Sequence, residues 1–124
     1  MLIVGCGDVG LRAAALLKNG SRVYALTSSA SRVSELHHQG ITAIKGNLDE
    51  PATLRRLAGV ATHLIHMAPP PLQGRSDPRT RALVQALQLR SSPQTVVYGS
   101  TSGVYGDCAG AWIDETQPLK PQTD

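Results

Sequence analysis

The sequence predicts an α/β fold built on a doubly wound parallel sheet with the strand order 3-2-1-4-5. Five short apolar segments alternate with four segments of helical periodicity along the 124 residues. The apolar segments are continuous runs, which is typical of parallel strands covered by helices on both faces. A glycine-rich segment, residues 5–10, joins the first strand to the first helix. Right-handed crossovers between such strands favour this strand order.

The first strand, residues 2–4, is an uninterrupted apolar run. Apolar residues then recur at helical spacing, and this first helix ends at Gly20. Residues 22–26 form the second predicted strand. The second helix starts with the serines around Ser29, which are common helix caps, and it ends at Gly40.

The third strand covers residues 41–45. The third helix begins at Pro51, where proline is tolerated because the first helical N–H needs no partner, and it ends at Gly59. The fourth strand, residues 63–67, is followed by three consecutive prolines that predict a stiff loop.

The fourth helix starts at Asp77 and Pro78, and the fifth strand covers residues 95–98. From Gly99 onward the chain is rich in Gly, Ser, Thr and Pro, which predicts an ordered loop. Trp112 in this loop is expected either to line a substrate pocket or to make a core or lid contact. We expect residues 1–124 to be one domain.

Composition excludes several classes of protein. With 41% hydrophobic and 17% charged residues the chain is too apolar to be disordered. No apolar stretch approaches the roughly 18 residues of a membrane span. The net charge of +3 comes from scattered basic residues, so neither a nucleic-acid nor a membrane partner is expected. The two cysteines and four histidines show no metal-ligand, redox or disulfide spacing, which favours a cytoplasmic protein without a metal site.

The segment Gly5-Cys6-Gly7-Asp8-Val9-Gly10 fits the pattern G-x-G-x-x-G between a strand and a helix, the context of a Rossmann-like dinucleotide site. Gly5 permits a tight turn, Gly7 lets the backbone approach a pyrophosphate, and Gly10 lets the helix pack on the strand. The helix start, with Asp8 and Val9, then offers free N–H groups to phosphate.

The end of the second strand favours NADP over NAD as the cofactor. A domain that binds the ribose 2′-hydroxyl of NAD has an acidic residue there, whereas this chain has Thr27 and Ser28, with Arg32 following. Small hydroxyls and an arginine suit a 2′-phosphate. The alternative is that Arg32 is only a solvated residue of the second helix.

Two residues after the third strand are further candidates for the cofactor site. Asn47 and Leu48 stand where they can reach the adenine of a dinucleotide. The alternative is that this turn only caps the next helix, with Asp49 as the cap before Pro51.

These motifs, together with Met67-Ala68-Pro69 and the segment Ser100-Thr101-Ser102-Gly103-Val104-Tyr105-Gly106, resemble the NAD-dependent epimerase/dehydratase family of the extended short-chain dehydrogenase/reductase superfamily, in an atypical branch. The resemblance spans residues 2 to about 121, the cofactor-binding part of such proteins. It implies that Ala68 and Pro69 lie beside the cofactor. It also implies that Thr101, or its neighbour Ser102, hydrogen-bonds the substrate.

The family's catalytic Tyr-x-x-x-Lys does not occur in these 124 residues, and we expect them to lack the substrate domain as well. We therefore expect a Rossmann-like sheet that is incomplete at its C-terminus. The resemblance implies a hydride-transferring oxidoreductase or epimerase/dehydratase acting on a sugar-nucleotide-like or polyol substrate, with a homodimer as one possible assembly. The alternatives are an NADP-sensing module that acts through a protein partner and an inactive fragment.

Overall fold

The computed structural model describes residues 1–71, 74 and 76–121; the side chain of Ser102 lies outside the described part. The strands are β1 (Leu2–Val4), β2 (Tyr24–Thr27), β3 (Thr42–Lys45), β4 (His63–His66) and β5 (Thr95–Tyr98). The α-helices are α1 (Asp8–Leu17), α2 (Ala30–His38) and α3 (Pro78–Gln88). Two 3₁₀ helices, η1 (Pro51–Leu57) and η2 (Ser102–Tyr105), complete the elements.

The five strands form one parallel sheet in the order β3-β2-β1-β4-β5, which confirms the predicted topology. β1 lies at the centre, and Val4 pairs with Leu26 on one side and with His66 on the other. The carboxyl ends of β1, β2 and β4 therefore meet at one edge. The chain reverses its direction of winding between β1 and β4, and such a switch point is where open α/β sheets bind ligands.

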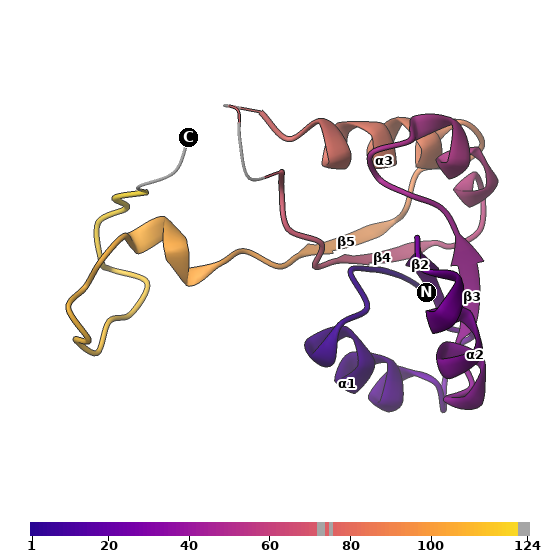
Figure 1. Ribbon diagram of the computed structural model, residues 1–124, viewed down its shortest axis with the longest axis horizontal. Coiled ribbons are helices and arrows are strands. Elements are labelled where there is room, and N and C mark those ends of the chain that lie inside the picture. Colours follow the sequence, from indigo (N-terminus) through magenta and orange to yellow (C-terminus); the bar gives the residue numbers. More distant parts are fainter. Residues whose placement is uncertain (72–73, 75, 122–124) are drawn as a thin grey trace.

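Helices cover the two faces of the sheet in separate groups, with α1 and α2 on one face and η1 and α3 on the other (Figure 1). Ile3 and Ile65 point into the core beneath α1 and α2. Leu2 and Leu64 point into the opposite core, against Leu83 of α3. This alternation explains why β1 is apolar at every position, because both of its faces are buried.

The expectation that every strand is covered on both faces is wrong for β5. Val96, Val97 and Tyr98 are each about half exposed. β5 lies at the edge of the sheet, and no helix among residues 1–71, 74 and 76–121 packs over it. The helices that precede it cover the sheet only as far as β4.

Two helical predictions also need correction. Residues 51–57 form the 3₁₀ helix η1 rather than an α-helix, and the stretch after Gly99 contains η2 within the predicted loop. Residues 99–121 run away from the sheet as an arm, which is drawn in orange to yellow (Figure 1). Within the described ranges, none of the helices is both long and apolar enough to span a bilayer.

Candidate functional site

A groove of about 410 Å³ runs along the carboxyl ends of the central strands. Its volume falls in the range of roughly 300–1,000 Å³ that is usual for small-molecule sites. A second hollow of about 230 Å³ adjoins it towards β3, and the two share Gly5, Leu26, Thr27 and Ser28. The residues that line the larger groove are Gly5, Cys6, Gly7, Leu26, Thr27, Ser28, Ser29, Arg32, Leu36, Met67 and Pro69.

Gly5 and Gly10 have the conformational roles that the motif predicts. Gly5 has φ +83°, and a Cβ there would overlap the backbone of Met67 and Ala68 at the end of β4. A Cβ on Gly10 would lie 3.0 Å from the carbonyl oxygen of Gly5 and 3.3 Å from Ile3. The turn therefore leaves no space for a side chain at Gly5, and α1 packs closely on β1 at Gly10.

Gly7 differs from the other two because a Cβ on it would meet no atom of the protein within 4 Å. Gly7 is the N-cap of α1, and no side chain caps this helix end. The first N–H groups of a helix lack acceptors within the helix, so the backbone of Asp8, Val9 and Gly10 presents donors here. The Asp8 carboxylate is held by Arg12 at 3.1 Å, and the Val9 side chain is exposed.

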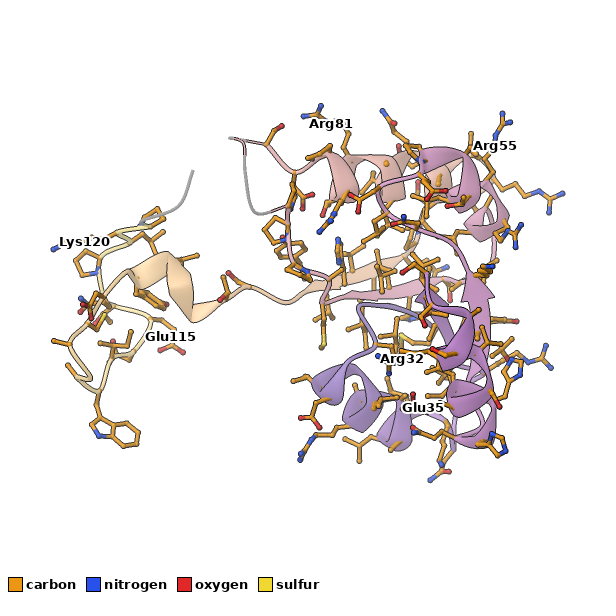
Figure 2. All side chains as sticks on the ribbon, in the orientation of Figure 1. Arg32, Glu35, Arg55, Arg81, Glu115 and Lys120 are labelled. Atoms are coloured by element: carbon orange, nitrogen blue, oxygen red, sulfur yellow. The ribbon has the colours of Figure 1, made fainter. Side chains whose placement is uncertain are left out.

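Arg32 reaches from α2 back to the glycine turn, so it is not a merely solvated residue. Its Nη2 donates to the carbonyl oxygen of Cys6 at 3.0 Å. Its Nε lies 3.5 Å from a Glu35 carboxylate oxygen without forming a hydrogen bond, and it has no acceptor among the described residues although it is buried. Figure 2 shows Arg32 and Glu35 together, whereas Arg55 and Arg81 project into solvent.

The hydroxyl groups at the end of β2 lie beside Arg32. Thr27 Oγ1 accepts from the backbone N–H of Ser29 at 3.3 Å, and Ser29 Oγ lies 2.7 Å from Ser31 Oγ. Ser28 is exposed and lines both hollows. The end of β2 thus presents hydroxyls and one guanidinium, with no carboxylate among its own residues.

The smaller hollow is walled by the loop after β3. Asn47 and Leu48 both line it. The Asn47 side chain is engaged within its own loop, because Oδ1 accepts from the Asp49 N–H at 3.1 Å and Nδ2 donates to Glu50 at 3.0 Å. The prediction that Asp49 caps the next helix is wrong, since Glu50 is the N-cap of η1 and makes no side-chain cap bond.

The Asp49 carboxylate instead pairs with Arg79, at the start of α3. Arg79 Nε and Nη2 donate to its two oxygens at 2.7 and 2.8 Å. These hydrogen bonds lower the pKa of Asp49. The sequence did not predict this pair, because 30 residues separate the partners and no local pattern connects them.

A second unpredicted network holds β4 to α3. His66 Nδ1 accepts from the Ala68 N–H at 3.3 Å, so its Nε2 carries the proton and donates to Thr80 Oγ1 at 2.8 Å. Thr80 donates in turn to Asp77, which caps α3 by accepting from the Thr80 N–H. Burial lowers the pKa of His66. Only the cap was visible in the sequence, from Asp77 before Pro78.

Thr101, one of the two predicted substrate residues, does not line the groove. Thr101 is exposed on the arm, where Oγ1 accepts from the Gly103 N–H at 3.3 Å. The side chain of Ser102 lies outside the described part. Trp112 is fully exposed, so the expectation that it packs on a core or lines a pocket is wrong.

The environment of Cys6 and the distribution of potential metal ligands do not indicate a reactive thiol or a metal site. Burial raises the pKa of the Cys6 thiol, which disfavours the nucleophilic thiolate. In the portion of the chain that the structure describes, no three His, Cys, Asp or Glu side chains gather as a metal site.

Comparisons with known proteins identify the family and relatives of the fold. Residues 1–98 match the TrkA-N domain family. No curated protein matches the chain. A conserved protein of unknown function from Silicibacter pomeroyi is 31% identical, with a TM-score of 0.72, over 99% of this chain and 42% of that one.

Two ligand-bound structures share the fold. The UDP-glucose 4-epimerase of Thermus thermophilus in complex with NAD is 23% identical, with a TM-score of 0.73, over 98% of this chain and 44% of that one. The NADPH-dependent quinone oxidoreductase of Escherichia coli in complex with NADPH is 22% identical, with a TM-score of 0.63, over 78% of this chain and 35% of that one. This chain spans about two fifths of the length of such solved chains. With four fifths of its residues matched, the chain belongs to the TrkA-N domain family of NAD(P)-binding Rossmann domains.

Proposed function

We propose that this domain binds NADP along the carboxyl ends of β1, β2 and β4, in preference to NAD. The observation that carries the proposal is the Arg32 guanidinium, which is anchored on the Cys6 carbonyl and lines the groove beside Ser28 and Ser29. A positive charge among hydroxyl groups matches a 2′-phosphate, whereas the 2′-hydroxyl of NAD calls for an acid.

Two features of the groove fit a bound dinucleotide. The buried Arg32 Nε finds no acceptor among the residues described, so a phosphate oxygen would satisfy a donor that is otherwise left unpaired. The space in front of Gly7, next to an uncapped helix start, leaves room for a pyrophosphate on the N–H groups of α1. Glu35 is half-exposed and can turn to solvent when a phosphate approaches Arg32.

We propose further that the domain serves a cytoplasmic oxidoreductase or epimerase/dehydratase of the extended short-chain superfamily, with a homodimer as its assembly. The nicotinamide, when bound, supplies the hydride acceptor and donor. In this proposal the substrate is sugar-nucleotide-like or a polyol, and Thr101 or Ser102 contacts it. The fold shared with an epimerase and a quinone oxidoreductase supports the class of chemistry.

One observation favours a second function, a cofactor sensor that acts through a partner. Thr101 lies on the exposed arm, outside the lining of the groove. A sensor needs only the groove. Turnover of NADPH with carbonyl substrates would favour the enzyme, and cofactor-dependent capture of a defined partner without turnover would favour the sensor.

Titration of the purified protein with NADPH and NADH, by calorimetry, tests the cofactor preference. We expect tighter NADPH binding. Arg32→Ala should weaken NADPH by roughly ten- to a hundredfold, the value of charge-assisted hydrogen bonds, and should change NADH less than about threefold. Arg55→Ala, which removes a solvent-exposed arginine, is the matched control. Tighter NADH binding would refute the preference for NADP.

A further inference from the structure

The ion pair between Asp49 and Arg79 lies at the mouth of the smaller hollow, and both residues line it. Arg79 stands at the start of α3 and Asp49 in the loop after β3, so the pair joins a helix and a loop that follow strands on opposite sides of β1. The Arg79 side chain is only 29% exposed. The pair therefore forms part of the wall of the hollow, with Arg79 the more covered and Asp49 the more exposed partner.

The hydrogen bonds of Arg79 use the edge of its guanidinium. Nε and Nη2 hold the two Asp49 oxygens, and Nη1 lies 3.4 Å from the carbonyl oxygen of Pro69. A guanidinium that is hydrogen-bonded through its edge can still be contacted on a flat face, and Arg79 lines the hollow. Such faces stack on aromatic rings, including nucleic-acid bases.

The rest of the hollow suits a flat ring. Val4, Leu26 and Leu48 supply apolar surface, and Gly46 supplies backbone without a side chain. Asn47, the polar residue that could read the edge of a base, already bonds Asp49 and Glu50. Recognition by stacking is thus better supported here than recognition by the Asn47 amide.

We propose that Arg79 stacks on the base of the bound dinucleotide, and that Asp49 is a positioning residue that holds the guanidinium flat. The proposal rests on the proposed cofactor binding and deepens it. It assigns the base to the hollow beside β3, while Arg32 faces the 2′-phosphate. Arg79 therefore contributes equally to NADP and NAD, because the two share the base.

The test measures dissociation constants of NADPH and NADH for Arg79→Met, Arg79→Lys and Asp49→Asn. Arg79→Lys keeps the positive charge but lacks the planar guanidinium. Both Arg79 variants should therefore raise the dissociation constant of NADPH roughly five- to tenfold. NADH should weaken by the same factor. Asp49→Asn should raise the dissociation constants less than the Arg79 variants do. The double variant with Arg79→Met should bind NADPH as weakly as Arg79→Met alone. Arg81→Met, on the exposed side of α3, is the matched control.

A direct readout separates contact from a merely structural role. Nuclear Overhauser effects between the adenine protons and the Arg79 side chain are expected in the wild-type complex, and they need no variant to fold. Their absence, or NADPH affinity within twofold of wild type in folded Arg79→Met, would overturn the proposal. Failure of the wild-type protein to bind either dinucleotide would instead reject the proposed function, and this proposal with it.

Discussion

Replacing Gly5 by alanine should damage the fold, even though the residue belongs to a ligand-binding motif. The backbone of Gly5 is left-handed, at φ +83°, and the new Cβ would overlap the main chain of Met67 and Ala68. The left-handed conformation costs an L-residue about 1–2 kcal/mol, and forced overlap in a packed region about 1–3 kcal/mol. We expect the free energy of unfolding to fall by about 2–5 kcal/mol, a large part of the roughly 5–15 kcal/mol typical of a domain.

Gly7→Ala is the matched control, because its Cβ would meet no protein atom and its φ is −81°. Its free energy of unfolding should stay within about 0.5 kcal/mol of wild type, or rise slightly through loss of unfolded-state freedom. NADPH binding should nevertheless weaken, since the Cβ occupies the space assigned to the pyrophosphate. Urea unfolding followed by circular dichroism measures the first effect and calorimetry the second. Equal destabilisation by the two substitutions would refute this division of roles.

Three further outcomes test the packing around the sheet. Asp77→Ala should lower the free energy of unfolding by about 1–2 kcal/mol in urea through loss of the α3 cap. Asp77→Asn should lower it less than Asp77→Ala, because the amide oxygen can still accept from the Thr80 N–H while the bond from the Thr80 hydroxyl is lost. Burial lowers the pKa of His66, so below about pH 6.5 the unfolded chain binds more protons than the folded one. The melting temperature should therefore drop between pH 7.5 and 5.5. His66→Gln should reduce this dependence of the melting temperature on pH. Ile3→Ala should lower the free energy of unfolding by about 2–5 kcal/mol, because Ile3 is buried. Val97→Ala should lower it by less than about 1 kcal/mol, because Val97 is half-exposed. Equal losses would show that β5 is covered.

The sheet order and the glycine turn were predictable because each follows from local or topological rules. Apolar runs locate buried strands, and the handedness of crossovers orders them. Gly5 and Gly10 are required by backbone geometry within one short segment, so their spacing between a predicted strand and a predicted helix reveals the turn. The exposure of β5 was not predictable, because a short apolar run such as residues 95–98 is compatible both with a strand covered by helices and with an uncovered one.

The side chains that complete the groove are harder to predict, since their partners are distant in sequence. Arg32 is a candidate phosphate ligand from its position alone, but its bond to Cys6 spans 26 residues and leaves no trace in a local pattern. Asp49 resembles a helix cap because a proline follows nearby, yet a bidentate guanidinium outcompetes a weak cap for a carboxylate. Long-range charge pairs of this kind depend on the fold and become visible only once β3 and α3 are placed.

Under the proposed function, the groove holds a cofactor and does not transfer protons. The glycine turn contributes backbone N–H groups, which do not titrate. Cys6 has a raised pKa, and His66 lies outside the lining with both ring nitrogens engaged. General acid–base catalysis needs a group with a pKa near the working pH in reach of the substrate, and the described lining of the groove holds none. Substitutions in this groove should therefore act on cofactor affinity, while the pH dependence of any turnover should come from a residue elsewhere.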